Sequence, residues 1–338
     1  MARVHIWTAD TAGSGWYRGY MVATALAWLG HRSSAGMRLP GDDLDTVIGC
    51  RIALPGPSQV WRELKEKGVR LVLDLDDDYF HLDPANAKAV EVWTPEMQKS
   101  LAANLAVSDV VTCCSEPLAE VLREYAEDVR VVPNGLPAQY LGTPRDYLAE
   151  GRPLYVGWAG SGSTISELPL AARALNRIAQ YTRPGGGEVR VRLVGITPEQ
   201  AMARGLKGKQ VGALGWVPHP EAYLRDVVSE FDVWCAPYRD IEFNQAKFPT
   251  KWLESSMLGI PLIASDIEPY RRVIRHGETG FLVRYEHEWG RLLKRLADDP
   301  ELRQRIGMTA RAEASGSILQ AVQFQWDAVI KKPAEVAA

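Results

Sequence analysis

One pattern restricts the fold of this chain more than any other: a short apolar run, a loop of small residues and a helix-like segment, which occurs twice. It begins at residues 4–7 and again at residues 154–158. Strand-like apolar runs then keep alternating with segments of helical apolar spacing, for example at residues 69–75 and 110–114. Such alternation is typical of parallel sheets covered by helices. The sequence therefore predicts an α/β protein with two doubly wound domains.

The size and composition of the chain are compatible with this fold. Its 338 residues are enough for two domains, each with its own core. A hydrophobic content of 46% and a charged content of 24% are those of a soluble globular protein, and no apolar stretch is long enough to span a membrane. The net charge of −3 gives no overall basic field that would favour nucleic acid. The four cysteines lack metal-ligand spacing, and the N-terminus lacks a signal-peptide layout, so we expect a cytoplasmic protein with reduced thiols.

The domain boundaries follow from the same patterns. We expect a first domain over residues 1–145 and a second over residues 152–315, because the polar, proline-bearing residues 143–153 are typical of a linker. An amphipathic pattern predicts a last helix within residues 316–338. Within the first domain, residues 51–54 are expected to form a strand.

Two lysines stand out in the second domain, where residues 240–265 are expected to form a loop, a helix, a tight turn and a buried strand. Lys251 falls in the first helical turn, and Lys247 lies just upstream. The helix macrodipole disfavours a cation there by roughly 0.3–1 kcal/mol. Two cations at the positive end of a helix therefore indicate a bound anion, such as a phosphate or diphosphate. Thr250 is positioned to cap this helix.

Glu254 follows Lys251 by nearly one helical turn, on almost the same face. A carboxylate beside a phosphate site commonly binds hydroxyls, which a ribose or a hexose would supply. The alternative is a surface helix with a weak ion pair between Lys251 and Glu254.

Residues 249–254 (Pro-Thr-Lys-Trp-Leu-Glu), 258–265 (Leu-Gly-Ile-Pro-Leu-Ile-Ala-Ser) and 274–283 resemble the donor-site signature of GT-B glycosyltransferases, most closely the retaining family 4 group. The resemblance extends over nearly the whole chain. It implies two facing Rossmann-like domains with a cleft between them, and a nucleotide sugar bound by the second domain. It also implies that the last helix crosses back to the first domain. One departure concerns Ala246, which stands where the family often has a glutamate eight positions before Glu254.

The resemblance also implies contacts to the nucleotide sugar. In the glycine loop at residues 159–164, backbone N–H groups can bind the diphosphate. A tryptophan lies where the family's loop flanks the nucleobase, although core packing is the alternative for it. With Ala246 in place of the glutamate, contacts to the hexose are expected from other polar residues, including Asp240. The candidate substrate-binding residues of the second domain are Gly160, Ser161, Trp216, Glu242, Asn244, Thr250 and Glu254.

The glycine loop of the first domain, residues 8–15, resembles the loop that faces the donor in GT-B proteins. It is not a dinucleotide fingerprint, because Arg18 stands where the third glycine would be. Gly15 and Arg18 are candidate substrate-binding residues, since the arginine can reach an anion. The alternative for Arg18 is a solvated helix arginine.

An acidic cluster, Asp-Leu-Asp-Asp-Asp at residues 74–78, follows a buried strand of the first domain. Carboxylates at the carboxyl end of a parallel strand lie where α/β sheets place ligands, so Asp76 and Asp77 are candidate catalytic residues. The same letters contain the Asp-x-Asp pattern that binds a metal in GT-A enzymes, and solvated loop carboxylates are a third possibility. Because family 4 enzymes generally need no metal, we expect neither a metal site nor a cofactor.

Together these features predict a hexosyltransferase that moves a hexose from a UDP- or GDP-linked sugar to a hydroxyl, with retention and without metal. Lys247 and Lys251 would meet the charge that grows on the leaving phosphate. A nucleotide-sugar epimerase and a non-catalytic sugar-nucleotide-binding module are the alternatives. The acceptor stays open among small metabolites, glycans, proteins and nucleic acid with a hydroxylated base. The last is included because four residues form a local basic patch: Arg271, Arg272, Arg275 and His276.

Overall fold

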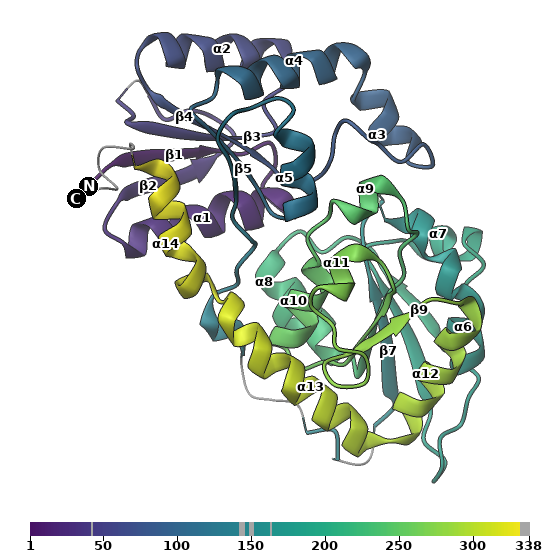
Figure 1. The fold of residues 1–338 in the computed structure, drawn as a ribbon. Helices are drawn as coiled ribbons and strands as arrows, with labels where there is room; N and C mark the ends of the chain where they lie inside the picture. Colours follow the sequence, from purple (N-terminus) through teal and green to yellow (C-terminus); the bar gives the residue numbers. More distant parts are fainter. Residues whose placement is uncertain (42, 142–145, 149–151, 163, 332–338) are drawn as a thin grey trace. The chain divides into compact units, whose positions relative to one another are not determined.

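The computed structural model describes residues 1–41, 43–141, 146–148, 152–162 and 164–331, which form two α/β units (Figure 1). Unit 1 comprises Met1–Pro137, Ala246–Phe248 and Ser317–Ala338, and unit 2 comprises Ala138–Gln245 and Pro249–Gly316. Most of the expected linker, at residues 142–145 and 149–151, lies outside the described residues.

Unit 1 contains a sheet of six parallel strands in the order β2-β1-β3-β4-β5-β6. The order reverses between β1 and β3, and such a switch point is where open α/β sheets bind ligands. The strands are β1 (Arg3–Trp7), β2 (Arg32–Gly36), β3 (Thr46–Cys50), β4 (Arg70–Leu75), β5 (Val110–Cys113) and β6 (Val129–Val131).

Helices cover both faces of this sheet (Figure 1). Helices α1 and α14 pack on one face through apolar residues such as Leu26 and Trp326. Helices α2, α4 and α5 pack on the other face, where Trp61 and Leu101 are fully buried. The helices are α1 (Met21–Trp28), α2 (Pro55–Glu66), α3 (Ala87–Val92), α4 (Pro95–Val107), α5 (Glu116–Leu122) and α14 (Leu319–Ile330), and a short π-helix, Trp16–Tyr20, precedes α1.

Unit 2 contains a second sheet of six parallel strands, in the order β12-β11-β10-β7-β8-β9. Counted from β7, this is the 3-2-1-4-5-6 order of the Rossmann fold, with its switch point between β7 and β10. The predicted α/β class with two Rossmann-like units is therefore confirmed. The strands are β7 (Leu154–Ala159), β8 (Val189–Val194), β9 (Val211–Leu214), β10 (Val233–Ala236), β11 (Leu262–Ser265) and β12 (Phe281–Val283).

The core of unit 2 lies between this sheet and its longer helices. Leu175 of α6, Leu293 of α12 and Ile306 of α13 are fully buried in one cluster with the strands. Helix α10 carries the stretch singled out by the sequence. The helices are α6 (Pro169–Ile178), α7 (Pro198–Ala203), α8 (Pro220–Ala222), α9 (Glu242–Gln245), α10 (Thr250–Met257), α11 (Glu268–Arg271), α12 (Glu286–Asp298) and α13 (Pro300–Ala314).

Helix α14 is attached to unit 1 by polar contacts at its C-terminal end. The guanidinium of Arg70 donates to the carbonyl of Val329 at 3.2 and 3.3 Å, and Arg130 donates to the carbonyl of Ala328 at 3.0 Å. The last carbonyls of a helix lack intrahelical partners, and cations are favourable there. The two arginines therefore satisfy and stabilise the end of the helix.

Residues Ala246–Phe248 belong to unit 1, although the chain on either side of them belongs to unit 2. The hydroxyl of Ser115 donates to the carbonyl of Ala246, and both Ala246 and Phe248 pack into the core beside α4 and α5. A glutamate at position 246 would bury a carboxylate in this core, at a cost of several kcal/mol unless paired. This packing explains why alanine suits the position.

Candidate functional site

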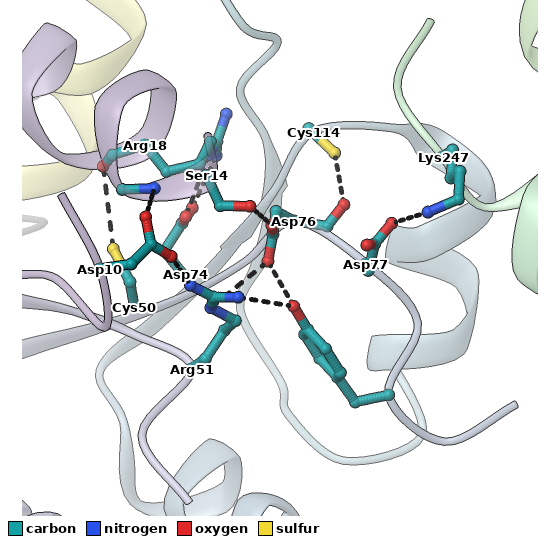
Figure 2. Close-up of polar contacts among 12 residues, drawn as sticks. Asp10, Ser14, Arg18, Cys50, Arg51, Asp74, Asp76, Asp77, Cys114 and Lys247 are labelled. Carbon is teal, nitrogen blue, oxygen red and sulfur yellow. Dashed lines mark hydrogen bonds and ion pairs between the residues drawn. The ribbon is translucent and has the colours of Figure 1, made fainter. Parts of the chain in front are cut away.

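The switch point of unit 1 carries a cluster of charged side chains (Figure 2). The loop after β1 supplies Asp10, and the residue after β3 is Arg51; their side chains form an ion pair. Among the described residues, Arg51 is the one non-glycine residue with a positive φ, 58°. This conformation costs about 1–3 kcal/mol and is concentrated at functional sites. The expected strand over residues 51–54 is wrong, because β3 ends at Cys50 and the chain turns at Arg51.

Asp76 extends the cluster from the end of β4. It accepts hydrogen bonds from the hydroxyl of Ser14 and, at 2.8 Å, from the hydroxyl of Tyr79 (Figure 2). Nε of Arg51 lies 3.8 Å from Oδ1 of Asp76 and makes no hydrogen bond in the described part of the chain. Burial raises the pKa of Asp76, but the Arg51 charge and the two hydroxyl donors outweigh it and hold this pKa below its usual value.

Asp77 is paired with Lys247, whose Nζ lies 2.5 Å from Oδ1 of the carboxylate (Figure 2). Burial and the neighbouring charge of Asp76 raise the pKa of Asp77, and the lysine only partly offsets them. Adjacent carboxylates with pKa values displaced in opposite directions are a recurrent feature of acid–base sites. Lys247 belongs to unit 1 and its charge is paired with Asp77, and its role toward an anion beside α10 stays a prediction.

Arg18 has a structural role that the sequence did not indicate. Its side chain is 2% exposed and forms a two-pronged pair with Asp74, at 2.6 and 3.0 Å. It also donates to the carbonyl of Val132 and to Asn134, and it stacks over Trp326. The prediction that Arg18 binds a substrate anion is therefore wrong, and so is the solvated alternative, because its donors are used in the core.

Gly15 also has an internal role. Its N–H donates to Oδ1 of Asp10 at 3.0 Å, and a Cβ at this position would lie 2.0 Å from the carbonyl oxygen of Asp10. The glycine thus permits the close turn that presents Asp10 to Arg51. The N–H of Gly15 is thus satisfied within the chain, and a contact of this glycine with substrate stays a prediction.

In the glycine loop after β7, the backbone N–H groups form hydrogen bonds within the chain. The N–H of Gly160 donates to the carbonyl of Val194 at 3.0 Å, and that of Ser161 donates to the hydroxyl of Thr164 at 3.1 Å. In this conformation both N–H groups have acceptors within the chain, and the expected contact of Gly160 and Ser161 with a diphosphate stays a prediction. The loop after β8 packs closely against this glycine loop. A Cβ on Gly195 would lie 1.8 Å from the carbonyl oxygen of Gly160, so a glycine is needed there.

Lys251 lies in the first turn of α10, as expected. Its Nζ donates to the hydroxyl of Tyr238, after β10, at 2.7 Å and lies 5.1 Å from the centre of the same ring. The phenol is a neutral partner, so the charge of Lys251 is not neutralised by it. Thr250 does not cap the helix, because Pro249 occupies the cap position without a side-chain hydrogen bond.

Glu254 is buried, with 6% of its surface exposed, and accepts a hydrogen bond from the hydroxyl of Tyr223 at 3.2 Å. The alternative of a surface ion pair is therefore wrong. Trp216, in contrast, is 55% exposed, which excludes the alternative of core packing. Burial and the charge of Glu254 raise the pKa of Tyr223, which keeps this phenol a hydrogen-bond donor.

Asn244 and Glu242 of α9 differ in their surroundings. Asn244 is buried and donates to Glu167 at 3.0 Å and to the carbonyl of Arg239 at 2.9 Å. The same Glu167 accepts from the guanidinium of Arg239 at 3.0 and 3.1 Å. Asn244 therefore supports this ion pair rather than offering its amide to a hexose, which corrects its prediction. Glu242 is exposed at the start of α9 and stays a predicted contact.

The basic patch at the end of α11 is largely neutralised. Arg271 pairs with Asp266 at 2.7 Å, and Arg272 pairs with Glu268. Arg275 pairs with two carboxylates, at 2.8 Å with Glu278 and more closely with a second on α13. The predicted local positive field, on which a nucleic-acid acceptor rested, is therefore weak.

Several residues in these two sites were missed by sequence reasoning. Asp10 follows the end of β1 and Arg51 follows the end of β3. This position, which Asp76 shares at β4, was the signal that could have identified them. Tyr238 and Arg239 follow β10 in the same way. No local signal marks the hydroxyl donors Ser14 and Tyr223, whose partners lie 62 and 31 positions away in the chain.

In the ranges that the structure describes, no three His, Cys, Asp or Glu side chains are grouped so as to hold a metal ion. No helix in these ranges is both long and apolar enough to cross a membrane.

Residues 153–299 match the family described as "Glycosyl transferases group 1", a segment that includes Trp216, Lys251 and Glu254. A phosphatidyl-myo-inositol mannosyltransferase from Mycobacterium leprae is 23% identical over 63% of this chain and 62% of its own length. A D-inositol 3-phosphate glycosyltransferase from Thermobispora bispora is 29% identical over 35% of this chain. The chain spans only 62% and 26% of the length of these two relatives.

Solved structures share the whole fold. Anabaena HepE, in complex with UDP-glucose, has a TM-score of 0.71 at 15% identity and covers 98% of this chain and 99% of its own. Sucrose-phosphate synthase from Thermosynechococcus elongatus has a TM-score of 0.71 at 15% identity, with 99% of both chains covered. The chain thus has the GT-B fold that these solved structures share. The match to the glycosyl transferases group 1 family lies within unit 2 of this fold, apart from Ala246–Phe248.

Proposed function

We propose that this protein is a hexosyltransferase that moves a hexose from a nucleoside-diphosphate sugar to a hydroxyl acceptor, without metal and with retention. The observation that carries the proposal is the presence of Lys251 and Glu254 on the same helix, α10, within the residues that match the group 1 family. Lys251 donates a hydrogen bond to the phenol of Tyr238, and the carboxylate of Glu254, one turn later, is buried. A cation and helix N–H groups suit a diphosphate, and a buried carboxylate suits hydroxyls.

In the donor complex, Lys251 would face the leaving diphosphate, and Glu254 would accept hydrogen bonds from the ribose. The exposed ring of Trp216 would pack on the base. As the bond between the anomeric carbon and the phosphate oxygen breaks, negative charge grows on that oxygen. A preorganised ammonium group stabilises this charge more in the transition state than in the ground state.

Unit 1 would bind the acceptor. Asp76 and Asp77 offer carboxylate oxygens at the end of β4, beside the switch point, and hydroxyl groups are suitable donors to them. Lys247 would act through Asp77, holding that carboxylate in place. The ion pairs of Arg271, Arg272 and Arg275 favour a small hydroxylated or glycan acceptor over nucleic acid. All four cysteines are buried and free, which supports a cytoplasmic location.

The test is a thermal-stability screen of the full chain with UDP-, GDP-, ADP- and TDP-sugars. The structures of HepE with UDP-glucose, with UDP and glucose, and with UDP make UDP-glucose the first donor to try. A donor at 100 times its dissociation constant adds about 2.7 kcal/mol of stability. The stabilising donor is then incubated with and without acceptors. Stabilisation with neither transfer nor hydrolysis would indicate a non-catalytic module, and a changed free sugar nucleotide would indicate an epimerase. If no sugar nucleotide stabilises the chain, the proposal fails.

A further inference from the structure

A cavity of about 600 Å³ lies in unit 2 at the edge of the sheet where the strands begin. It is lined by the first residue of β7, Leu154, by the turn at residues 184–187 before β8, and by Asp232 before β10. Lys251 and Trp216 follow the carboxyl ends of strands, at the opposite edge of the same parallel sheet. The cavity is therefore distinct from the proposed donor site, and its volume is typical of a small-molecule site.

Arg303 of α13 lines this cavity and is 3% exposed. Its Nη1 donates to the carbonyls of Leu296 and, at 3.2 Å, Ala297, at the end of α12. Its Nε is buried and makes no hydrogen bond with any residue that the structure describes. A buried cation normally has a carboxylate partner, and none of the described carboxylates lies within 4.0 Å of this guanidinium.

Arg183 provides a second cation in the same cavity. Its Nη2 donates to the carbonyl of Arg152 at 3.3 Å, and its buried Nε is likewise without a partner in the described ranges. The guanidinium lies against the backbone of Gly187, where a Cβ would be 2.3 Å from Nη2. The glycine therefore makes room for a flat cationic group at the cavity wall, and this group also forms no ion pair among the described residues.

The carboxylates that line the cavity are bound to other groups. Asp232 pairs with Arg152 and accepts from the N–H of Tyr155 at 2.7 Å. Asp298 pairs with Lys294 and accepts from the hydroxyl of Tyr181 at 2.7 Å. Glu188 pairs with Arg190, and Asp146 accepts from the N–H of Leu148. Arg183 and Arg303 thus line the cavity, each with a buried Nε that has no partner in the described ranges and with a charge that no described carboxylate pairs.

We propose that this cavity binds a small molecule through a phosphate group held by Arg183 and Arg303. Guanidinium groups match the geometry of phosphate oxygens and form strong charge-assisted hydrogen bonds with them. The volume leaves room for more than the phosphate itself, which favours a phosphorylated metabolite over the free ion. Since the cavity lies at the other edge of the sheet from α10, its ligand would act as an effector and not as the sugar donor.

The test is calorimetric titration of the full chain with inorganic phosphate and, separately, with glucose 6-phosphate, each with and without saturating UDP. We expect glucose 6-phosphate to bind with a dissociation constant below about 1 mM. The variant Arg183→Gln, at a half-buried position, should weaken binding by about tenfold or more. The matched control is Arg173→Gln, an exposed arginine of α6 outside the cavity, which should leave binding unchanged.

The outcomes separate the possible sources of the anion. Tighter binding of glucose 6-phosphate assigns the site to a phosphorylated metabolite, and binding of inorganic phosphate alone assigns it to the free ion; both retain the phosphate site. Absence of binding by either probe would overturn the proposal. Binding that UDP abolishes, or that Arg183→Gln leaves unchanged while the variant keeps its thermal stability, would locate the anion elsewhere and overturn it too. None of these outcomes depends on transferase activity, so the test is independent of the proposed function.

Discussion

The two switch points have related topologies but opposite electrostatic character. In unit 1, the charged groups beside β1, β3 and β4 neutralise one another: Arg51 lies between Asp10 and Asp76, and Lys247 lies on Asp77. In unit 2, Lys251 donates to the phenol of Tyr238, and Trp216 is exposed to solvent. The comparison suggests a division of labour: unit 2 has an unneutralised cation ready for an anion, whereas unit 1 offers balanced carboxylates suited to neutral hydroxyl groups.

The largest effect is expected from Lys251→Ala. If the charge of this lysine serves the leaving diphosphate, its removal should lower kcat by on the order of 10²–10³. Stability should be unchanged or slightly higher, because a cation at a helix N-terminus is unfavourable. Steady-state kinetics and thermal unfolding measure the two effects, and Lys209→Ala, an exposed lysine of the same unit, is the control. Normal turnover in Lys251→Ala would remove the contrast between the units.

A smaller effect is expected from Glu254→Ala. Ribose hydroxyls change little during the reaction, so losing their acceptor should weaken binding of donor and free nucleoside diphosphate alike. A hydrogen bond to a charged group contributes roughly 1.5–3 kcal/mol, which corresponds to about 10- to 100-fold in the dissociation constant. Calorimetric titration with UDP measures it, with Glu254→Gln to separate loss of charge from loss of volume. Unchanged UDP affinity in both variants would contradict the assigned role.

The carboxylates of unit 1 should titrate with opposite effects on stability. The pKa of Asp77 is raised, so the folded state holds its proton longer than the unfolded state, and stability falls as pH rises from the unfolded pKa to the folded one. The pKa of Asp76 is lowered, so its contribution is present above the unfolded pKa and is lost as pH falls through the folded pKa. Each slope is at most about 1.4 kcal/mol per pH unit.

Denaturant unfolding from acidic pH, below the unfolded aspartate pKa of about 3.9, up to neutral pH, in wild type, Asp76→Asn and Asp77→Asn, checks this prediction. The first variant should remove a rise in stability with pH, and the second should remove a fall. Slopes that change in the same direction in both variants would show that the two carboxylates do not differ as described.

The smallest effect is expected from chelation. EDTA should leave activity nearly intact, because the proposed transfer relies on Lys251 and the helix N–H groups for charge stabilisation. Complete loss of activity that Mn²⁺ or Mg²⁺ restores, and that Asp76→Ala reproduces, would instead make unit 1 a metal site and reverse the roles of the two switch points.

The sequence predicted what depends on local periodicity, and it failed where distant residues decide the outcome. Strand and helix alternation was enough to predict both sheets, and the position of Lys251 in its helix was correct. Arg18 was assigned to a ligand because its partners, Asp74 and Trp326, lie 56 and 308 positions away in the chain. Likewise, no local pattern indicates that the N–H of Gly160 bonds to Val194. Buried polar groups must find partners, but the sequence alone does not say which.

The three-residue segment Ala246–Phe248 and helix α14 have a practical consequence for genetic dissection of this protein. Neither unit is encoded by one continuous stretch of codons. A truncated gene ending near residue 145 would lack Trp326, which covers the buried Arg18, and Ala246, which satisfies the hydroxyl of Ser115. Its product would expose the apolar face of the sheet that α14 covers and should aggregate. Producing unit 1 by itself therefore requires the C-terminal codons to be fused to the N-terminal ones, and not a simple deletion.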